Sequence, residues 1–595
     1  MKRGNLEKWS SISTCNNLLF FSQLVNELLF DYSIPSNRIS TLNSHYLCLD
    51  ALSAIEGIDD HGVPEGTLKP IMEELYSEIK KDPVFSESDS PADFFVKYQN
   101  DRYVICNRVA DMGYQELKNA AIAINNCYFD DNKYFNQLKR QITEIVKANK
   151  SSDQQTLFRL TKSLLTELMN TGYSLRYLYM MMNRLFWEPK EVICSNDAID
   201  TFFDAFSFRV NDYTVIFKVQ KNKIETLINF LEGLECSEEL PENIHRADKT
   251  FLQKKRGEAF LVITRKAFDP YDAAERAMHL LETNMSVYRL YDHRYYYNIA
   301  DADCMICDAE NYYKMGRSIK PVEHTKTPSV KEIAESMNLA SDAIQSVAKT
   351  GNYSDFTSVL NAIRYHSHSL DSFSEENQLL DLWAIFESVL DISNKHTSDR
   401  IQQVCMYLVP LLKQRYLYSL FKQLSDDIKT YNEELFASIT ENETVESEIV
   451  RRICEFTLLP EHSEKRAEVL EKGKDFPLLA ERISYYNEAL QTPAKIHSFV
   501  EKHAIRVKWQ VMRIYRNRNL IIHNGSSMPY LSLLIENLHS YVDDFLAYTI
   551  HSLSQKKSIE LMCQELFVKE CKWNASFPRQ KDSITREQIK YILSA

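Results

Sequence analysis

Apolar residues recur three and four positions apart over most of the chain. The first clear stripe consists of Leu18, Phe21, Leu24, Val25, Leu28 and Leu29. A second stripe consists of Leu157, Leu160, Leu164, Leu165 and Leu168. Ser152 and Asp153 can cap this second helix at its start, and Gly172 can end it. Because this spacing places apolar side chains on one face of a helix, it predicts a helical N-terminal region over residues 1–195.

The pattern changes between residues 196 and 325. Large apolar residues alternate over residues 213–219, and residues 259–264 are also rich in apolar and β-branched residues, so both segments are predicted to be strands. Residues 224–234 are predicted to be a helix. Asp269 and Pro270 can cap and open a second helix that runs to Glu282. This order predicts a small α/β insert, and the lack of a glycine-rich loop argues against a nucleotide-binding unit.

Helical spacing returns after residues 317–329, whose prolines predict a linker. We expect residues 326–553 to form a second helical bundle. Residues 554–595 contain Trp573 and Phe577, so we expect this tail to pack on the bundle. Glycine is scarce, with 12 residues among 595, as is typical of a mainly α protein.

Residues 511–525, which read V-M-R-I-Y-R-N-R-N-L-I-I-H-N-G, combine a helical pattern with a charged end. The upstream stripe, which we expect to face a core, consists of Ile505, Trp509 and Met512. The same face continues to Arg516, Asn519 and His523. Gly525 is the predicted end of the helix, so His523 should lie in its last turn. Cationic side chains beside a titratable histidine can hold a phosphate and move a proton.

Residues 518–523 read R-N-L-I-I-H, which resembles the R-N-x-x-x-H motif of HEPN domains (higher eukaryotes and prokaryotes nucleotide-binding). Residues 377–391, N-Q-L-L-D-L-W-A-I-F-E-S-V-L-D, look like the HEPN helix that carries an acidic residue facing the motif, here Glu387. Residues 398–412 continue the likeness, which covers roughly residues 374–553. Within the family, the chain looks most like the Apea-like group of anti-phage defence proteins.

The resemblance implies a helical bundle and a function. Many HEPN domains are metal-independent ribonucleases, and they usually dimerise so that two motifs form one composite site. It therefore implies an endoribonuclease that cleaves RNA, with tRNA as a candidate substrate, as a homodimer or higher homo-oligomer and without cofactor or metal. The implied setting is abortive infection, with the N-terminal part sensing a phage-derived activator. The alternative is a non-catalytic HEPN scaffold for dimerisation or nucleotide binding.

The resemblance also assigns roles to residues. His523 would act as general base or acid while the RNA 2′-hydroxyl attacks its phosphate, and Arg518 would stabilise the growing charge. Asn519 could orient the imidazole or bind the phosphate, and Glu387 could position Arg518 or His523. Helix geometry favours Arg516 instead, because Arg518 lies about 140° around the helix from His523. A long arginine side chain can reach across that angle, so Arg518, which the resemblance favours, ranks first and Arg516 second. A purely structural polar helix end is the alternative.

Charge limits how RNA could bind. The formal net charge of −13 argues against a generally basic nucleic-acid-binding surface, so any RNA contact needs a local basic patch. Arg451, Arg452 and residues 465–474 are a candidate track for the RNA backbone. A solvated helix face explains the same charges and is the slightly favoured interpretation.

The twelve cysteines are scattered, which predicts reduced thiols in a cytosol. Cys304 and Cys307 form a C-x-x-C pair, but the spacings of His293 and His324 match no zinc pattern, so we expect ordinary thiols. The N-terminus lacks the apolar core of a signal peptide, and residues 18–30 are too short and too polar to span a bilayer. We therefore expect a cytoplasmic protein with no membrane partner.

Overall fold

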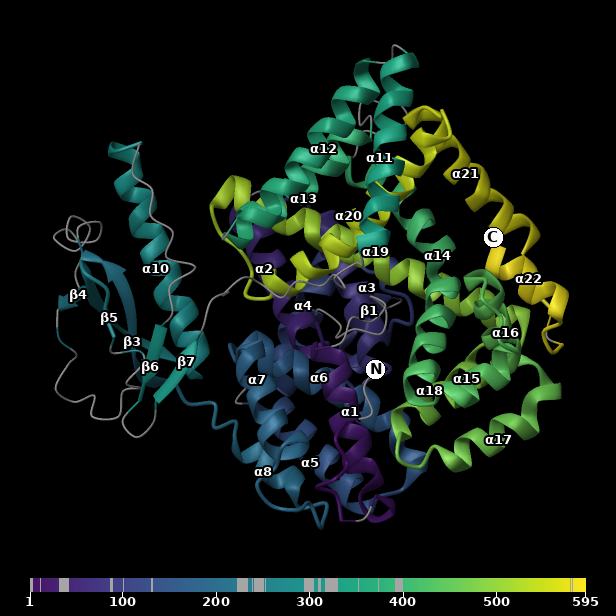
Figure 1. Cartoon of the computed structure of the whole chain (residues 1–595), viewed down its shortest axis with the longest axis horizontal. Helices are drawn as coiled ribbons and strands as arrows, with labels where there is room; N and C mark the ends of the chain where they lie inside the picture. The colour runs from purple at the N-terminus through teal and green to yellow at the C-terminus, as the bar shows by residue number, and fades with distance from the viewer. Residues whose placement is uncertain are drawn as a thin grey trace. The chain divides into compact units, whose positions relative to one another are not determined.

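The computed structural model of the chain is mainly helical, with a small sheet (Figure 1). It describes residues 4–10, 12–30, 42–61, 63–85, 89–99, 101–129, 132–221, 234–237, 239, 251, 253–293, 304–308, 312–315, 330–350, 353–372, 374–390, 400–577, 579–580 and 582–594. The predicted linker at 317–329 and nearly all of the predicted helix at 224–234 lie outside these residues. The chain forms two compact units, one of residues 1–167, 192–199 and 324–595, and one of residues 168–191 and 200–323.

The first unit begins with helices from the N-terminal third of the chain. These are α1 (Asn16–Phe30), α2 (Ser44–His61), α3 (Leu68–Ile79), α4 (Tyr114–Ile124), α5 (Lys133–Ala148) and α6 (Gln154–Thr171), of which α6 continues into the second unit. A hairpin of β1 (Val96–Gln99) and β2 (Arg102–Ile105) lies between α3 and α4 in the chain. Helix α6 ends directly before Gly172, as predicted. The φ angle of Gly172 is +120°, which favours glycine there.

The rest of the first unit consists of helices from the C-terminal half. These are α11 (Val330–Thr350), α12 (Tyr353–Asp371), α13 (Glu375–Val389), α14 (Arg400–Tyr431), α15 (Glu433–Thr440), α16 (Glu446–Leu458), α17 (Ser463–Lys472), α18 (Pro477–Ala489), α19 (Pro493–Asn524), α20 (Leu531–Ser554), α21 (Ile559–Ser576) and α22 (Arg586–Ser594). Over the two units together, short 3-10 or π helices lie at Ser13–Cys15, Glu65–Thr67, Pro91–Phe94, Val109–Asp111, Asn125–Phe129, Ser151–Asp153, Asn183–Trp187 and Pro460–His462.

Helix α1 is buried on every side. The predicted stripe is buried, but so are Leu19 and Phe20 between its members, and so are polar residues such as Glu27. Arg482 of α18 lies 2.8 Å from Glu27 and 3.3 Å from Asp427 of α14. A buried carboxylate and guanidinium must be paired, so this contact fixes α1 against the C-terminal helices.

The N-terminal helices therefore share one unit with the C-terminal bundle. The expected division placed residues 1–195 and 326–553 in separate domains, and the structure divides the chain differently. Helical spacing shows that a face is apolar but does not show which partner covers it. The insert expected at residues 196–325 corresponds to most of the second unit, which also takes in residues 168–191.

The C-terminal tail packs on the bundle as predicted. The indole N–H of Trp573 donates to Glu501 of α19 at 3.0 Å, and the rings of Trp573 and Phe577 are buried. The backbone N–H of Ile584 donates to the carbonyl of Gln491 at 3.1 Å. In the described part of the chain, no helix has the length and apolar character needed to cross a membrane.

The second unit contains an antiparallel sheet in the order β4-β5-β3-β6-β7. Its strands are β3 (Asn211–Gln220), β4 (Leu234–Ser237), β5 (Glu258–Ala267), β6 (Cys304–Cys307) and β7 (Tyr312–Met315), and its helices are α7 (Leu175–Met182), most of α8 (Ala198–Asp204) and α10 (Pro270–Tyr291). The two strands predicted at 213–219 and 259–264 are β3 and β5, which pair with Val215 opposite Ile263. The Asp269 carboxylate caps α10 by accepting from the N–H groups of Tyr271 and Asp272.

Cys304 and Cys307 both lie in β6, the strand that pairs with β3. Residues three apart in a strand point to opposite faces of the sheet, so the two thiols cannot bind one metal ion. Cys307 belongs to a buried apolar cluster, and burial raises its pKa to about 11. Neither cysteine forms a disulfide.

Candidate active site at the end of helix α19

Helix α19 carries the motif at its C-terminal end. It begins with Pro493 after the Thr492 cap and ends at Asn524. Gly525 follows with φ +62°, and its N–H donates to the carbonyl of Ile521 at 3.1 Å. The left-handed conformation requires a residue such as glycine, which is why the helix stops there. His523 therefore lies in the last turn, as predicted.

The face of α19 that meets the core is not the predicted one. Ile505, expected to face inward, is 47% exposed, and Trp509 and Met512 are only half-buried. The buried stripe instead consists of Val500, Ala504, Val507, Val511 and Ile514. Both stripes are apolar at helical spacing, so spacing could not choose between them. The buried stripe continues at Arg518, four residues after Ile514, and this places Arg518 on the inward side of the helix.

Arg518 meets the acidic residue of α13. Its guanidinium lies 3.4 Å from one carboxylate oxygen of Glu387 and 3.5 Å from the other. The same carboxylate accepts a hydrogen bond from the indole N–H of Trp383 at 3.0 Å, and Arg518 also donates to the amide oxygen of Asn519 at 3.1 Å. The Arg518 and Glu387 side chains are 19% and 25% exposed, so the pair borders solvent. The expected approach of Glu387 to Arg518 is confirmed.

Arg516 points to a different neighbour. Its guanidinium pairs with Asp50 of α2, whose side chain is only 2% exposed and also accepts a hydrogen bond from the Tyr530 hydroxyl at 2.7 Å. Arg513, one turn earlier, lies 3.5 Å from Asp50 and pairs with Glu74 of α3. Burial raises the pKa of Glu74 to about 6, and the charge of Arg513 opposes that rise. These arginines join α19 to the N-terminal helices.

His523 is open to solvent. In the described part of the chain, its ring makes no hydrogen bond or ion pair, although Asn519 lies one turn before it on the same face. One chain therefore brings together Arg518, Asn519 and Glu387 and leaves the imidazole free for a ligand or a second copy. Trp383 was missed by the sequence analysis, although its position four residues before Glu387 places both on one helix face.

Comparison of the chain with protein-family models, with curated proteins and with solved structures finds no match. What the site can do therefore follows from its own residues. It offers a cation held in a defined direction by a carboxylate and an amide, and an accessible imidazole five residues later on the same helix. Such a set can bind a phosphate group and transfer a proton.

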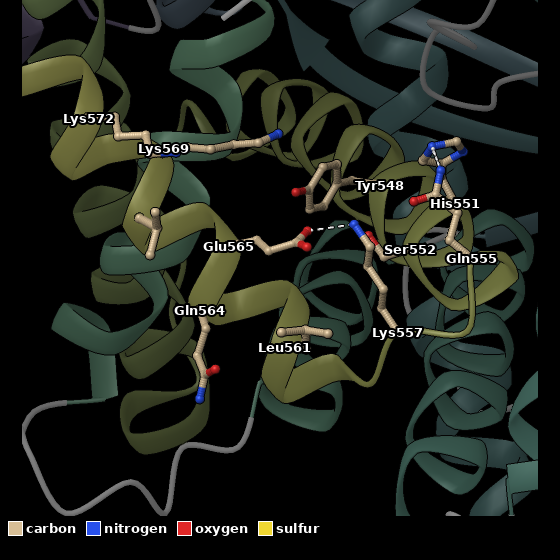
Figure 2. Close-up of a pocket in the computed structure, with 11 residues that line it drawn as sticks. Tyr548, His551, Ser552, Gln555, Lys557, Leu561, Gln564, Glu565, Lys569 and Lys572 are labelled. Atoms are coloured by element: carbon tan, nitrogen blue, oxygen red, sulfur yellow. Dashed lines mark hydrogen bonds and ion pairs between the residues drawn. The ribbon is translucent and has the colours of Figure 1, made fainter. Parts of the chain in front are cut away.

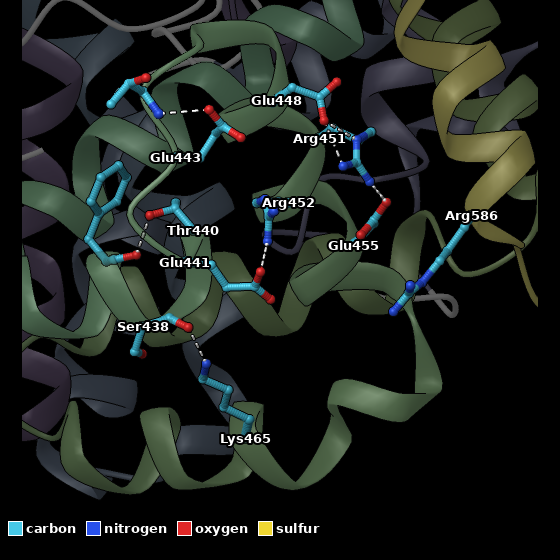
Figure 3. Close-up of polar contacts among 12 residues, drawn as sticks. Ser438, Thr440, Glu441, Glu443, Glu448, Arg451, Arg452, Glu455, Lys465 and Arg586 are labelled. Carbon is cyan, nitrogen blue, oxygen red and sulfur yellow. Dashed lines mark hydrogen bonds and ion pairs between the residues drawn. The ribbon is translucent and has the colours of Figure 1, made fainter.

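The predicted track for the RNA backbone is occupied by ion pairs (Figure 3). Arg451 of α16 pairs with Glu448 and Glu455, and Arg452 pairs with Glu441. Lys465 donates to the carbonyl of Ser438 at 2.8 Å. Figure 3 shows Glu441 against Arg452 and Glu455 against Arg451, and these four residues help to line a cavity of about 230 Å³. The cations here join helices α15, α16 and α17 rather than forming a free basic surface.

Proposed function

We propose that this chain is a metal-independent endoribonuclease of HEPN type. The observation that carries the proposal is the contact between Arg518 and Glu387, on the same helix end of α19 that carries the exposed His523. The contact joins the two segments whose sequences resemble the family, although they are more than a hundred residues apart in the chain. The Asp50 partner of Arg516 is almost completely buried, whereas the pair of Arg518 and Glu387 borders solvent, so the proposal assigns phosphate binding to Arg518.

The reaction begins with the 2′-hydroxyl of the RNA. His523 removes its proton, the 2′-oxygen bonds to the adjacent phosphorus, and the bond from phosphorus to the 5′-oxygen breaks. Arg518 stabilises the negative charge on the phosphoryl oxygens, while Glu387 and Asn519 fix the direction of its guanidinium. The leaving 5′-oxygen takes up a proton, so the products end in a 2′,3′-cyclic phosphate and a 5′-hydroxyl.

A second copy of the chain completes the proposed site. Removing one proton and delivering another in the same step needs two groups, and one copy offers one exposed imidazole at this helix end. A homodimer that brings two α19 ends together supplies both. The proposed role in anti-phage defence, with tRNA as substrate and a phage-derived activator, rests on the family resemblance. The pairing of Asp50 with Arg516 offers a physical link from the N-terminal helices to the motif.

The test uses the full-length protein with total tRNA in EDTA, followed by analysis of the product ends. We expect cleavage that leaves 2′,3′-cyclic phosphates and that is lost in His523→Ala. His368→Ala is the matched control, because His368 is also exposed but lies on α12. Circular dichroism should show that both variants keep the wild-type helix content.

Two outcomes would speak against the nuclease. Cleavage that persists unchanged in His523→Ala would remove the histidine from the mechanism. RNA that stays intact even after addition of infected-cell lysate would favour the non-catalytic scaffold, since Glu387 already neutralises Arg518 in the single chain.

A further inference from the structure

A second candidate site lies between α20 and α21, away from the motif (Figure 2). Helix α20 ends at Ser554, Lys556 adopts a left-handed φ of 65°, and the Ser558 hydroxyl caps α21. The turn sets the two helices at an angle and leaves a groove of about 590 Å³ between them. This volume is in the range of about 300–1,000 Å³ that is usual for ligand sites. We call it the α20–α21 groove; its lining includes Tyr548, His551, Gln555, Lys557, Leu561, Gln564, Glu565, Val568, Lys569 and Lys572.

The groove carries uncompensated positive charge. Lys557 and Glu565 neutralise each other at 2.8 Å, as Figure 2 shows. Lys569 and Lys572, one turn apart on α21, are exposed and have no carboxylate partner among the described residues. In a chain of net charge −13, such a patch attracts anions where most of the surface would repel them. Arg451 and Arg452, in contrast, are both paired with carboxylates.

The walls of the groove are aromatic and apolar. Leu561 and Val568 are 44% and 48% exposed, although both are large apolar residues. Lys569 extends toward the Tyr548 ring, with its Nζ atom 5.8 Å from the ring centroid (Figure 2). Gln564 adds groups that can donate and accept hydrogen bonds. A flat aromatic ring beside free cations suits a ligand in which flat bases alternate with anionic groups.

We infer that the α20–α21 groove binds single-stranded RNA, with Lys569 and Lys572 on the phosphates and Tyr548 stacked against a base. That the groove holds the substrate during cleavage rests on the proposed nuclease function. That the groove binds RNA does not rest on it. Tyr548 lies 17 residues into α20, and α20 starts just after the turn that follows His523, so the groove and His523 are about 25 Å apart along that helix. The groove therefore anchors the substrate at a distance from the bond that is cut.

The test measures binding of a fluorescein-labelled oligouridylate by fluorescence anisotropy over a range of salt concentrations. The groove variant is Lys569→Gln/Lys572→Gln. The control is Lys502→Gln/Lys590→Gln, which removes the same charge from exposed lysines on α19 and α22. We expect the groove variant to bind about tenfold more weakly at low salt. The slope of log K against log salt should be less steep by about 1.4, because two phosphate contacts are lost. The control should bind within about twofold of wild type.

A second variant tests stacking. Tyr548→Leu keeps an apolar side chain but removes the ring, and we expect binding about fivefold weaker or more. Binding of the oligouridylate is measured separately from cleavage, so binding can succeed even if no cleavage is found. If cleavage is found, the lysine variant should raise KM for long RNA and leave kcat unchanged.

Three results would overturn the inference. They are no binding of the oligouridylate by the wild-type protein, equal losses in the groove variant and the control, and binding of a labelled polyglutamate peptide that the groove variant loses while the oligouridylate does not bind. The last result would assign the groove to an acidic peptide instead.

Discussion

At the residue scale, two arginines two positions apart have different surroundings. Arg516 is held by Asp50, which is almost completely buried, whereas Arg518 is held by Glu387 at the edge of solvent. Removing one member of a buried ion pair leaves an uncompensated charge and costs about 3–5 kcal/mol. A partly exposed pair contributes about 1 kcal/mol or less. The two positions should therefore respond differently to the same substitution.

We expect Arg516→Ala to lower the free energy of unfolding by about 3 kcal/mol, because Asp50 would lose its main cation. Arg518→Ala should cost about 1 kcal/mol or less but should slow the proposed RNA cleavage about 100-fold, because in that mechanism the phosphate would lose its cation. Denaturant unfolding and cleavage assays on both variants measure the two effects. A larger loss of stability in Arg518→Ala than in Arg516→Ala would contradict this assignment.

At the element scale, α19 is both a core helix and the carrier of the motif. His503 in its first half is buried and stacks on Tyr416 of α14, with ring centroids 3.6 Å apart. Burial, followed by the nearby charge of Arg506, lowers the pKa of His503 to about 3. The unfolded chain protonates this histidine below about pH 6.5, whereas the folded chain does so only near pH 3. The contribution of His503 to the free energy of unfolding is therefore fully present above about pH 6.5 and is lost as the pH falls from there toward pH 3.

We expect His503→Phe to reduce the acid sensitivity of the fold. Between pH 7 and pH 5, the wild-type protein should lose about 2 kcal/mol of unfolding free energy through His503, and the variant should not. Phenylalanine keeps a flat ring against Tyr416, so the substitution changes the titration more than the packing. Urea unfolding of both proteins at the two pH values measures the difference. Equal losses would show that His503 is accessible to protons in the folded state.

At the scale of the whole molecule, the N-terminal and C-terminal helices of the first unit depend on each other. Helix α1 is enclosed, and Glu27 pairs with Arg482. Asp50 and Glu74 of the N-terminal helices likewise form ion pairs with Arg513 and Arg516 of α19. Without the N-terminal helices, three arginines of the C-terminal helices would lose carboxylate partners and apolar faces would lie open to water.

We expect residues 324–595, produced alone, to be unfolded or insoluble, because Arg513 and Arg516 would have no counter-charge and Arg482 would keep only Asp427. Residues 1–199 supplied by co-expression should restore a soluble complex that copurifies. Circular dichroism, thermal melting and size-exclusion chromatography report the two results. A stable, cooperatively melting fragment 324–595 would show that the bundle folds independently.

The sequence by itself determined the features that depend on neighbouring residues. Gly525 ends α19, the Asp269 cap opens α10, and β3 lies where large apolar residues alternate, because capping, turn and pleat chemistry act within a few residues. The approach of Glu387 to Arg518 was also anticipated, through the likeness of both segments to one family.

Only the tertiary structure decided which face of α19 is buried, which arginine has a buried carboxylate partner and where positive charge stays free. Ile505 and Val507 are equally apolar, and the helices that pack on α19 leave the first exposed and bury the second. Asp50 lies far from Arg516 in the chain, so no local pattern could show their pairing. These outcomes depend on which surfaces meet after folding, and that information is spread over contacts between distant segments.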